Sequence, residues 1–264
     1  MRGRTLLSHF VLSALFLLFA VAGCSDDKST SPASGTVSLR MTDAPAAVDA
    51  INLVITQVSI NQSEGDEGWE VLRSDSMNVD LLTLRNGVFT NLGTARVAAG
   101  SYSQVRLKLG AGSTIVVDGV TYPLTVPSGM QSGLKIVAPF HVPSGGTVDV
   151  QLDFDAARSI VLTGSGTYIL KPVIRIMPTT IAGAIKGRVL PTTVQTTVYA
   201  IQAPDTIGSA ITTGDGSFMV SVLPAGTYSV AFHPASDYRD TTLVNVNVTT
   251  GNTTDVGDVQ LTHQ

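Results

Sequence analysis

The sequence predicts an all-β protein, with two antiparallel β-sandwich-like domains in tandem. Apolar and polar residues alternate with a period of two along much of the chain, as in residues 105–109, 148–154 and 228–232. In an antiparallel sheet this alternation buries one face and leaves the other in water. Turn residues such as Asp118-Gly119 and Asp215-Gly216 separate the runs at short intervals. No segment has the periodicity of a long helix.

Residues 1–23 have the features of a bacterial lipoprotein signal peptide. Arg2 and Arg4 give a positive start, and an apolar run from Phe10 to Ala22 follows. The run is shorter than the roughly 20 residues of a transmembrane helix. It ends in small residues before Cys24, the single cysteine, and this ending resembles the lipobox of bacterial lipoproteins. The resemblance implies that Cys24 becomes the first residue of the mature chain and carries palmitate and other acyl chains.

Residues 24–35 are polar and lack apolar periodicity, which predicts a flexible tether. Each lipid methylene contributes about 0.8 kcal/mol and one chain alone is marginal, so two or three chains would hold the protein on a membrane. Ser25 after the cysteine resembles lipoproteins sorted to the outer membrane. We therefore expect a lipid-anchored protein of the cell envelope, at the cell outer membrane, facing the periplasm or the cell surface.

Composition limits the partners and chemistry of the mature chain. Loss of two arginines with the signal peptide lowers the formal net charge from −4 to −6, and a chain without a basic stripe is not expected to bind nucleic acid. The mature fold cannot contain an internal disulfide. The chain lacks a Gly-x-Ser-x-Gly elbow, a His-Glu-x-x-His motif and a phosphate-binding P-loop. We expect no catalytic residue, no cofactor and no enzymatic activity.

A boundary between two β-rich domains is predicted near Pro178. The first domain spans residues 36–178 and the second spans residues 182–264, so only a few residues join them. The mature length suits two domains better than one. No repeat period crosses the boundary. The best short helix candidate in the chain is 80–85, where Asp80 would cap a turn or two.

Residues 36–178 resemble an uncharacterised family of bacterial lipoprotein domains, catalogued only as a domain of unknown function. The resemblance carries no known activity. It rests on motifs in a fixed order: Gly35-Thr36-Val37-Ser38-Leu39, Thr42-Asp43-Ala44-Pro45, Val54 to Ile60 leading to Trp69, Asp80-Leu81-Leu82, Ala99-Gly100-Ser101-Tyr102 before Val105-Arg106-Leu107, Leu124-Thr125-Val126-Pro127-Ser128, Leu152-Asp153-Phe154-Asp155-Ala156 and Leu170-Lys171-Pro172-Val173-Ile174-Arg175.

Residues 182–264 resemble the carboxypeptidase regulatory-like, or transthyretin-like, module. That resemblance implies a seven-stranded β-sandwich that acts as a spacer, stabiliser or adhesive unit. The motifs that carry it are Ile185-Lys186-Gly187-Arg188-Val189, Val198-Tyr199-Ala200, Thr213-Gly214-Asp215-Gly216-Ser217-Phe218, Leu223-Pro224-Ala225-Gly226-Thr227-Tyr228 and Val246-Asn247-Val248.

An acidic strand is the strongest candidate for metal chemistry. Asp149, Asp153 and Asp155 fall at even spacing opposite the apolar positions of residues 148–154 and are expected on the solvent-exposed face. Asp153 and Asp155 could bridge calcium if a loop added carbonyl ligands. The favoured interpretation is a solvated face that pairs across strands with residues such as Arg106, Lys108 or Arg158, without a metal.

Trp69 is the candidate for a ligand contact, because it follows a predicted hairpin loop and aromatic rings bind sugars at exposed sites. The favoured alternative is a core aromatic between the sheets. His141 and His233 are expected to have structural or surface roles.

These observations favour a membrane-anchored envelope lipoprotein that is a non-catalytic interaction, adhesion or structural module. Its expected partners are the membrane, through the N-terminal lipid, and an envelope protein or glycan. The alternative is a ligand-binding accessory lipoprotein for glycan or metal capture. A hydrolase is the third hypothesis, and it would require a cleft that joins His, Ser and Asp.

Overall fold

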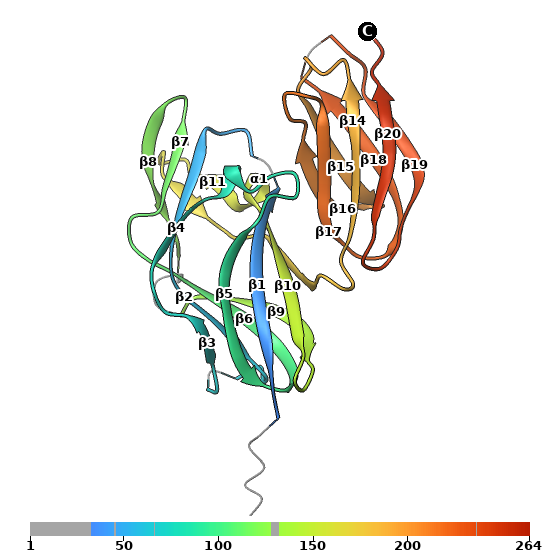
Figure 1. Ribbon diagram of the computed structural model, residues 1–264. Coiled ribbons are helices and arrows are strands. Elements are labelled where there is room, and N and C mark those ends of the chain that lie inside the picture. Colours follow the sequence, from blue (N-terminus) through green and yellow to red (C-terminus); the bar gives the residue numbers. More distant parts are fainter. Residues whose placement is uncertain (1–32, 45, 66, 128–131, 236) are drawn as a thin grey trace, which may run out of the picture. The chain divides into compact units, whose positions relative to one another are not determined.

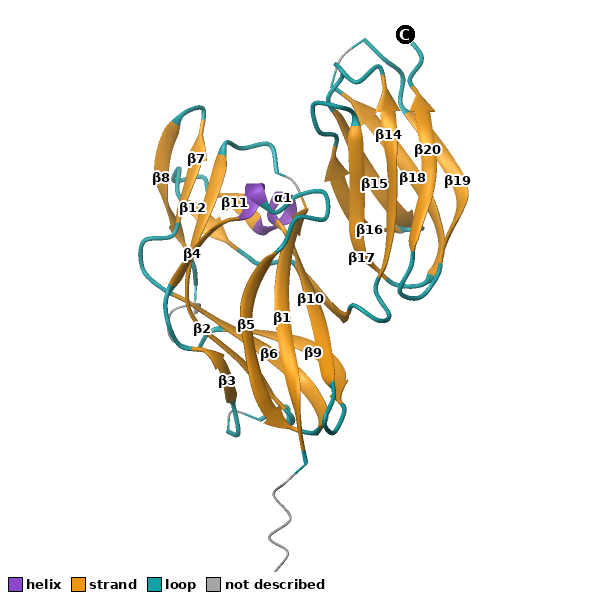
Figure 2. Ribbon diagram, viewed as in Figure 1, coloured by secondary structure: helices purple, strands orange, loops and turns teal. Residues whose placement is uncertain are grey.

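The computed structural model describes residues 33–44, 46–65, 67–127, 132–235 and 237–264. Strands form most of this part of the chain (Figure 2), and the prediction of an all-β fold with sandwich-like sheets is confirmed. The signal peptide, Cys24 and the first part of the predicted tether lie outside the described residues. None of the described helices is long and apolar enough to cross a membrane.

The first sandwich has a four-stranded sheet with the strand order β13-β10-β1-β5, and Figure 1 labels β10, β1 and β5 side by side. Strand β1 is parallel to β10 and antiparallel to β5. Ser34 and Gly35, predicted as the end of the tether, are the first residues of β1. The bounds are β1 (Ser34–Ala44), β5 (Thr90–Ala98), β10 (Thr147–Asp155) and β13 (Ile174–Pro178).

The second sheet of this sandwich follows the order β11-β12-β8-β7-β2-β6-β9, and β3 and β4 also pair with β2. The bounds of its strands are β2 (Ala50–Asn61), β3 (Glu70–Arg73), β4 (Met77–Asp80), β6 (Gly100–Leu109), β7 (Thr114–Val117), β8 (Val120–Thr125), β9 (Leu134–Val142), β11 (Ile160–Leu162) and β12 (Tyr168–Leu170).

Two short helical turns join strands of the first sandwich: η1 (Leu81–Thr83) and α1 (Ala156–Ser159). The predicted cap is confirmed at η1, where the Asp80 carboxylate accepts a hydrogen bond from the backbone N–H of Leu82. The same carboxylate oxygen accepts from the N–H of Ile51. Asp80 therefore ties the turn to β2.

The second sandwich packs a three-stranded sheet, β17-β14-β20, against a four-stranded sheet, β16-β15-β18-β19. Strand β14 is antiparallel to β17 and parallel to β20. The bounds are β14 (Gly183–Leu190), β15 (Thr196–Gln202), β16 (Asp205–Ile211), β17 (Ser217–Leu223), β18 (Gly226–Pro234), β19 (Thr241–Val248) and β20 (Thr253–Gln260).

Each sandwich has its own hydrophobic core among the described residues. One cluster of buried side chains extends in sequence from Val37 to Leu170, and the other extends from Ile185 to Leu261. The alternation in the sequence explains both cores, because every second residue of a strand faces the opposite sheet.

The two sandwiches share one strand topology, although no repeat is evident in the sequence. In each, the first strand is antiparallel to β5 or β17 and parallel to the later strand β10 or β20. In each, the second strand, β2 or β15, pairs with β6 or β18, which pairs in turn with β9 or β19. The first sandwich adds the β7–β8 hairpin and strands β11 to β13 to this common frame.

A buried tyrosine follows an equivalent turn in both sandwiches. The chain reads Ala-Gly-Ser-Tyr at 99–102 and Ala-Gly-Thr-Tyr at 225–228. Each tyrosine hydroxyl donates to the carbonyl four residues earlier, over 2.9 Å to Ala98 and 2.7 Å to Pro224. The bond closes the turn at the start of β6 and β18, so the same device fixes the register of two hairpins.

Tyr102 should make stability sensitive to high pH. Its hydroxyl also lies 2.7 Å from the Glu70 carboxylate, and burial together with Glu70 raises its pKa to about 12. The unfolded chain has a tyrosine pKa of about 10. The stabilisation by neutral Tyr102 is thus complete below about pH 10 and is lost as the pH rises towards 12.

Tyr102→Phe should be less stable than the wild type at pH 8 and should lose less stability between pH 9 and 11. Urea denaturation over this range measures the difference. Tyr122→Phe, at the surface, should follow the wild type. Parallel pH profiles for the wild type and Tyr102→Phe would contradict the assignment.

Candidate functional site

Three buried carboxylates lie at one end of the first sandwich, where β1 and β10 end. Because these strands are parallel, Thr42 lies beside Asp153 and Ala44 beside Asp155. Asp43, Asp153 and Asp155 are each less than 5% exposed. Two motifs more than a hundred residues apart in the sequence therefore form one polar cluster.

The prediction that Asp153 and Asp155 lie on a solvent-exposed face is wrong. Both lie on the face of β10 opposite the core residues Leu152 and Phe154, as the alternation requires. That outer face is covered, however, because β17 contacts β10 and β13, and β16 contacts β1. Only Asp149, at the other end of β10, stays partly exposed, and it pairs with Arg40 over 3.2 Å.

Asp153 is held by Arg175, its direct neighbour across the antiparallel pair β10 and β13. The Nε and Nη2 atoms of Arg175 both donate to Asp153 Oδ2. The guanidinium also donates to the backbone carbonyls of Ile207 and Ser221 in the second sandwich. Burial raises the pKa of Asp153, and the charge of Arg175 opposes that rise.

Asp155 caps the short helix α1. Its carboxylate accepts from the Arg158 N–H over 3.0 Å and from Arg158 Nε over 2.7 Å. Arg158 is one of the three predicted partners, but it pairs with Asp155 within a helix cap and not across strands as expected. The Asp155 carbonyl accepts a hydrogen bond from the hydroxyl of Ser159. The Oγ atom of Ser159 in turn accepts from the N–H of Val173. The cap thus connects β10, α1 and the segment before β13.

Asp43 is the least satisfied member of the cluster. Its Oδ1 accepts from the N–H of Ala156 over 3.2 Å, but its buried Oδ2 has no hydrogen-bond partner within the described part of the chain. Burial raises its pKa well above the usual range, and the charge of Asp153 adds to the rise. Asp43 is therefore the carboxyl of the cluster whose ionised form the fold supports least.

The chemistry of this cluster is structural. Its carboxylates bind guanidinium and backbone N–H groups. The hydroxyl group of Ser159, which lies beside them, makes its hydrogen bonds with the main chain. Within the described ranges, no group of three or more His, Cys, Asp or Glu residues is placed to hold a metal ion. The calcium alternative for Asp153 and Asp155 would require displacing the arginines bound to them.

Trp69 is partly buried, and the guanidinium of Arg106 lies 4.1 Å from the centre of its ring. The indole N–H is buried and has no hydrogen-bond partner among the described atoms. The Arg106 guanidinium therefore covers one face of Trp69, the residue predicted as a ligand contact.

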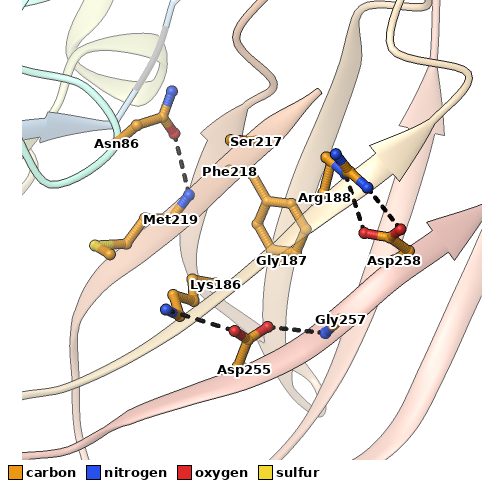
Figure 3. Close-up of a pocket in the computed structure, with 10 residues that line it drawn as sticks. All are labelled: Asn86, Lys186, Gly187, Arg188, Ser217, Phe218, Met219, Asp255, Gly257 and Asp258. Atoms are coloured by element: carbon orange, nitrogen blue, oxygen red, sulfur yellow. Dashed lines mark hydrogen bonds and ion pairs between the residues drawn. The ribbon is translucent and has the colours of Figure 1, made fainter. Parts of the chain in front are cut away.

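A shallow pocket of about 380 Å³ involves the sheet of β14, β17 and β20 (Figure 3). Two ion pairs line it: Lys186 with Asp255 over 3.5 Å and Arg188 with Asp258 over 2.8 Å. All four side chains are about half exposed. Sequence reasoning did not find this pocket, because the pairs depend on the parallel alignment of β14 and β20, which are some 70 residues apart.

Comparison with protein families identifies the first sandwich. A family described as "Domain of unknown function (DUF4382)" matches residues 34–172. The chain belongs to this family. The expected relationship to an uncharacterised domain is confirmed, and the DUF4382 region includes Asp43, Asp153 and Asp155 but ends before Arg175. No curated protein matches the chain.

Three solved structures show remote likenesses to the chain. A cohesin–X-dockerin complex from Acetivibrio cellulolyticus has 22% identity, with 30% of this chain and 57% of that chain covered and a TM-score of 0.26. The Bacillus anthracis TIE protein has 9% identity, with 87% and 34% covered and a TM-score of 0.24. The Streptococcus agalactiae minor pilin GBS52 has 12% identity, with 86% and 96% covered and a TM-score of 0.22.

The buried ion pair of Asp153 and Arg175 should contribute far more to the free energy of unfolding than an exposed ion pair. Asp153→Asn should lower the free energy of unfolding by about 3 kcal/mol, because the Arg175 guanidinium loses its counter-charge in a buried site. Asp258→Asn, the matched control in an exposed pair with Arg188, should have a much smaller effect. Urea denaturation at pH 7 compares them. Equal losses would show that the Asp153 pair is as well solvated as a surface pair.

Asp43→Asn should flatten the pH dependence of stability. Because the folded pKa of Asp43 is raised, the folded chain keeps this proton as the pH rises past about 4, where the unfolded chain loses it. Wild-type stability should therefore contain a component that falls as the pH rises from about 4. Denaturation between pH 4 and 8 tests this, with Asp149→Asn as the control. An unchanged profile in Asp43→Asn would refute it.

Proposed function

We propose that this protein is a membrane-anchored envelope lipoprotein that acts as a non-catalytic interaction, adhesion or structural module. One observation carries the proposal: the buried acids Asp153 and Asp155 are paired with Arg175 and Arg158 and hold strands and turns of the fold together. Arg175 joins β13 to β10 through Asp153 and reaches two backbone carbonyls of the second sandwich. Groups bound in this way serve rigidity rather than turnover.

The anchor in this proposal is the lipid on Cys24, followed by a tether that ends where β1 begins, at Ser34. The two units presented beyond it are residues 36–178 and the transthyretin-like residues 182–264. We place the protein at the outer membrane on the basis of Ser25. An envelope protein is the partner we favour, because the Arg106 guanidinium occupies one face of Trp69, the residue on which glycan capture would depend.

A hydrolase has less support. His141 Nδ1 lies 3.5 Å from the hydroxyl of Ser101, at the outer limit of a hydrogen bond and on an exposed surface. No described carboxylate hydrogen-bonds to that ring. His233 pairs with Asp240 over 2.9 Å, and both side chains are at least half exposed.

Cys24→Ala should release the protein from the membrane. In a bacterial host that processes lipoproteins, the wild type should fractionate with membranes and partition into detergent, because its acyl chains are buried there. The variant should appear in the soluble fraction or remain as an uncleaved precursor. Ser25→Ala, which keeps the acylated cysteine, is the control. A Cys24→Ala protein of mature size that still partitions into detergent would disprove lipid anchoring.

A further inference from the structure

A groove of about 530 Å³ lies along the start of β9 in the first sandwich. It is lined by residues 133–137, and by Pro172 and Ile174 from the start of β13. Strands β9 and β13 are the last strands of the two sheets, and they contact each other. The groove therefore lies where the two sheets meet at one side of the sandwich, and its volume is within the range of ligand sites.

Apart from a glycine and Lys135, the lining of this groove is apolar. Leu134, Ile136 and Ile174 are partly buried and pack against the core of the sandwich. Val137 is 74% exposed, the highest value for a large apolar side chain in the described part of the chain. Exposed apolar surface at a concave site indicates a place where another molecule binds.

Three cations adjoin the groove on the outer face of the sheet. Lys135 lies directly opposite Arg106 in the pair of β9 and β6, and Lys108 follows two residues later on the same face of β6. Strands β2, β6 and β9 contain no acidic residue. Like charges directly opposite each other in a sheet are destabilising. The cluster thus favours an anion from outside these strands.

Gly133 sets the positions of the two cations on β6. Its φ is 76°, which favours glycine, and a Cβ atom there would lie 2.9 Å from Cγ of Arg106 and 3.1 Å from Cγ of Lys108. The aliphatic parts of both side chains therefore pack over the glycine. Both residues remain partly exposed, and their Cα atoms are about 7 Å apart along the strand.

Other cations on the strands are paired within the fold. Arg40, Arg175, Lys186 and Arg188 each pair with an aspartate of a neighbouring strand. Lys108 has no ion pair within the residues that the structure describes. The fold does not use this charge, so it is available to an anionic partner.

We propose that the groove and the cations Arg106, Lys108 and Lys135 bind an extended acidic segment of an envelope protein. Apolar side chains of the segment occupy the groove beside Val137, and its carboxylates pair with Lys108 and Lys135. This inference rests on the proposed role as an interaction module, and it names the chemistry of the partner.

The observations favour a protein segment over an anionic membrane surface. Carboxylates two residues apart on an extended segment are about 7 Å apart, which matches the spacing of Arg106 and Lys108. A short segment responds to charges within a Debye length of roughly 8 Å. A membrane faces a wider area of a mature chain whose formal net charge is −6, and an anionic membrane would be repelled by that charge.

The experiment measures peptide binding to residues 25–264, produced without lipid. The probe is the fluorescein-labelled peptide Glu-Leu-Glu-Leu-Glu-Leu-Glu, and fluorescence anisotropy in about 50 mM NaCl gives its Kd. Lys108→Gln, Lys135→Gln should weaken binding at least tenfold. Arg96→Gln, Arg239→Gln removes the same charge from exposed arginines elsewhere and should bind within twofold of the wild type. Raising NaCl to about 500 mM should weaken wild-type binding at least tenfold.

Val137→Asp tests the groove separately. The side chain is exposed, so the variant should fold, and the new carboxylate at the groove should weaken peptide binding at least fivefold. A peptide of the same composition in block order, Glu-Glu-Glu-Glu-Leu-Leu-Leu, should also bind at least fivefold more weakly, because it lacks the alternation of acid and apolar side chains.

Several outcomes would overturn the proposal. Wild-type protein that does not bind the peptide at 1 mM would do so, as would equal binding by the block peptide. Binding that persists in Lys108→Gln, Lys135→Gln would keep the interaction role and refute this surface. Vesicles of phosphatidylcholine with about 30% phosphatidylglycerol that bind more tightly than the peptide, through the same lysines, would identify a membrane site instead. The lipid anchor is tested independently by Cys24→Ala.

Discussion

The ion pair between Asp153 and Arg175 is the contact on which the arrangement of the first sandwich depends. A carboxylate buried on the outer face of a sheet is costly unless a cation and further hydrogen bonds compensate it. Arg175 meets the first requirement only in the register that places β13 beside β10. The remaining N–H groups of its guanidinium need acceptors, and the carbonyls of Ile207 and Ser221 supply them. One buried charge thus constrains the β10–β13 register and engages two backbone carbonyls of the second sandwich.

The strands could be predicted from the sequence, but whether their outer faces are exposed to solvent or covered could not. Period-two alternation separates the core face of β10 from the other face, and the core side is occupied as expected by Val148, Val150, Leu152 and Phe154. The pattern does not distinguish a face in water from a face covered by another domain, because polar residues occupy both. The cover is formed by backbone groups of β16 and β17, which any sequence provides. That is why Asp153 and Asp155 were expected in solvent and are found buried.

The strand topology that the two sandwiches share is not visible in the sequence, for a related reason. Pairing in a sheet uses main-chain groups, so two sandwiches can share strand order while few side chains correspond. The one local match, Ala-Gly-Ser-Tyr against Ala-Gly-Thr-Tyr, marks a turn where a hydroxyl must reach a particular carbonyl. The hairpin of β7 and β8 then displaces β9 and β10 along the sequence, which destroys any fixed period. The two sandwiches thus share a residue where the turn needs a tyrosine hydroxyl, and their side chains differ where only main-chain groups pair.

The limits of the DUF4382 match have a physical consequence. The match ends at residue 172, whereas the counter-charge of Asp153 lies three residues beyond it, on β13. A first sandwich cut at residue 172 would keep the three carboxylates but lose Arg175 and the strands β16 and β17 that cover the outer face of β10, so Arg158 would be the remaining arginine paired with the cluster. Water or protonation would then have to compensate the charge of Asp153. The unit that satisfies its own electrostatics therefore includes β13 and extends to Pro178, and even this unit leaves the Arg175 guanidinium to be completed by the backbone of the second sandwich.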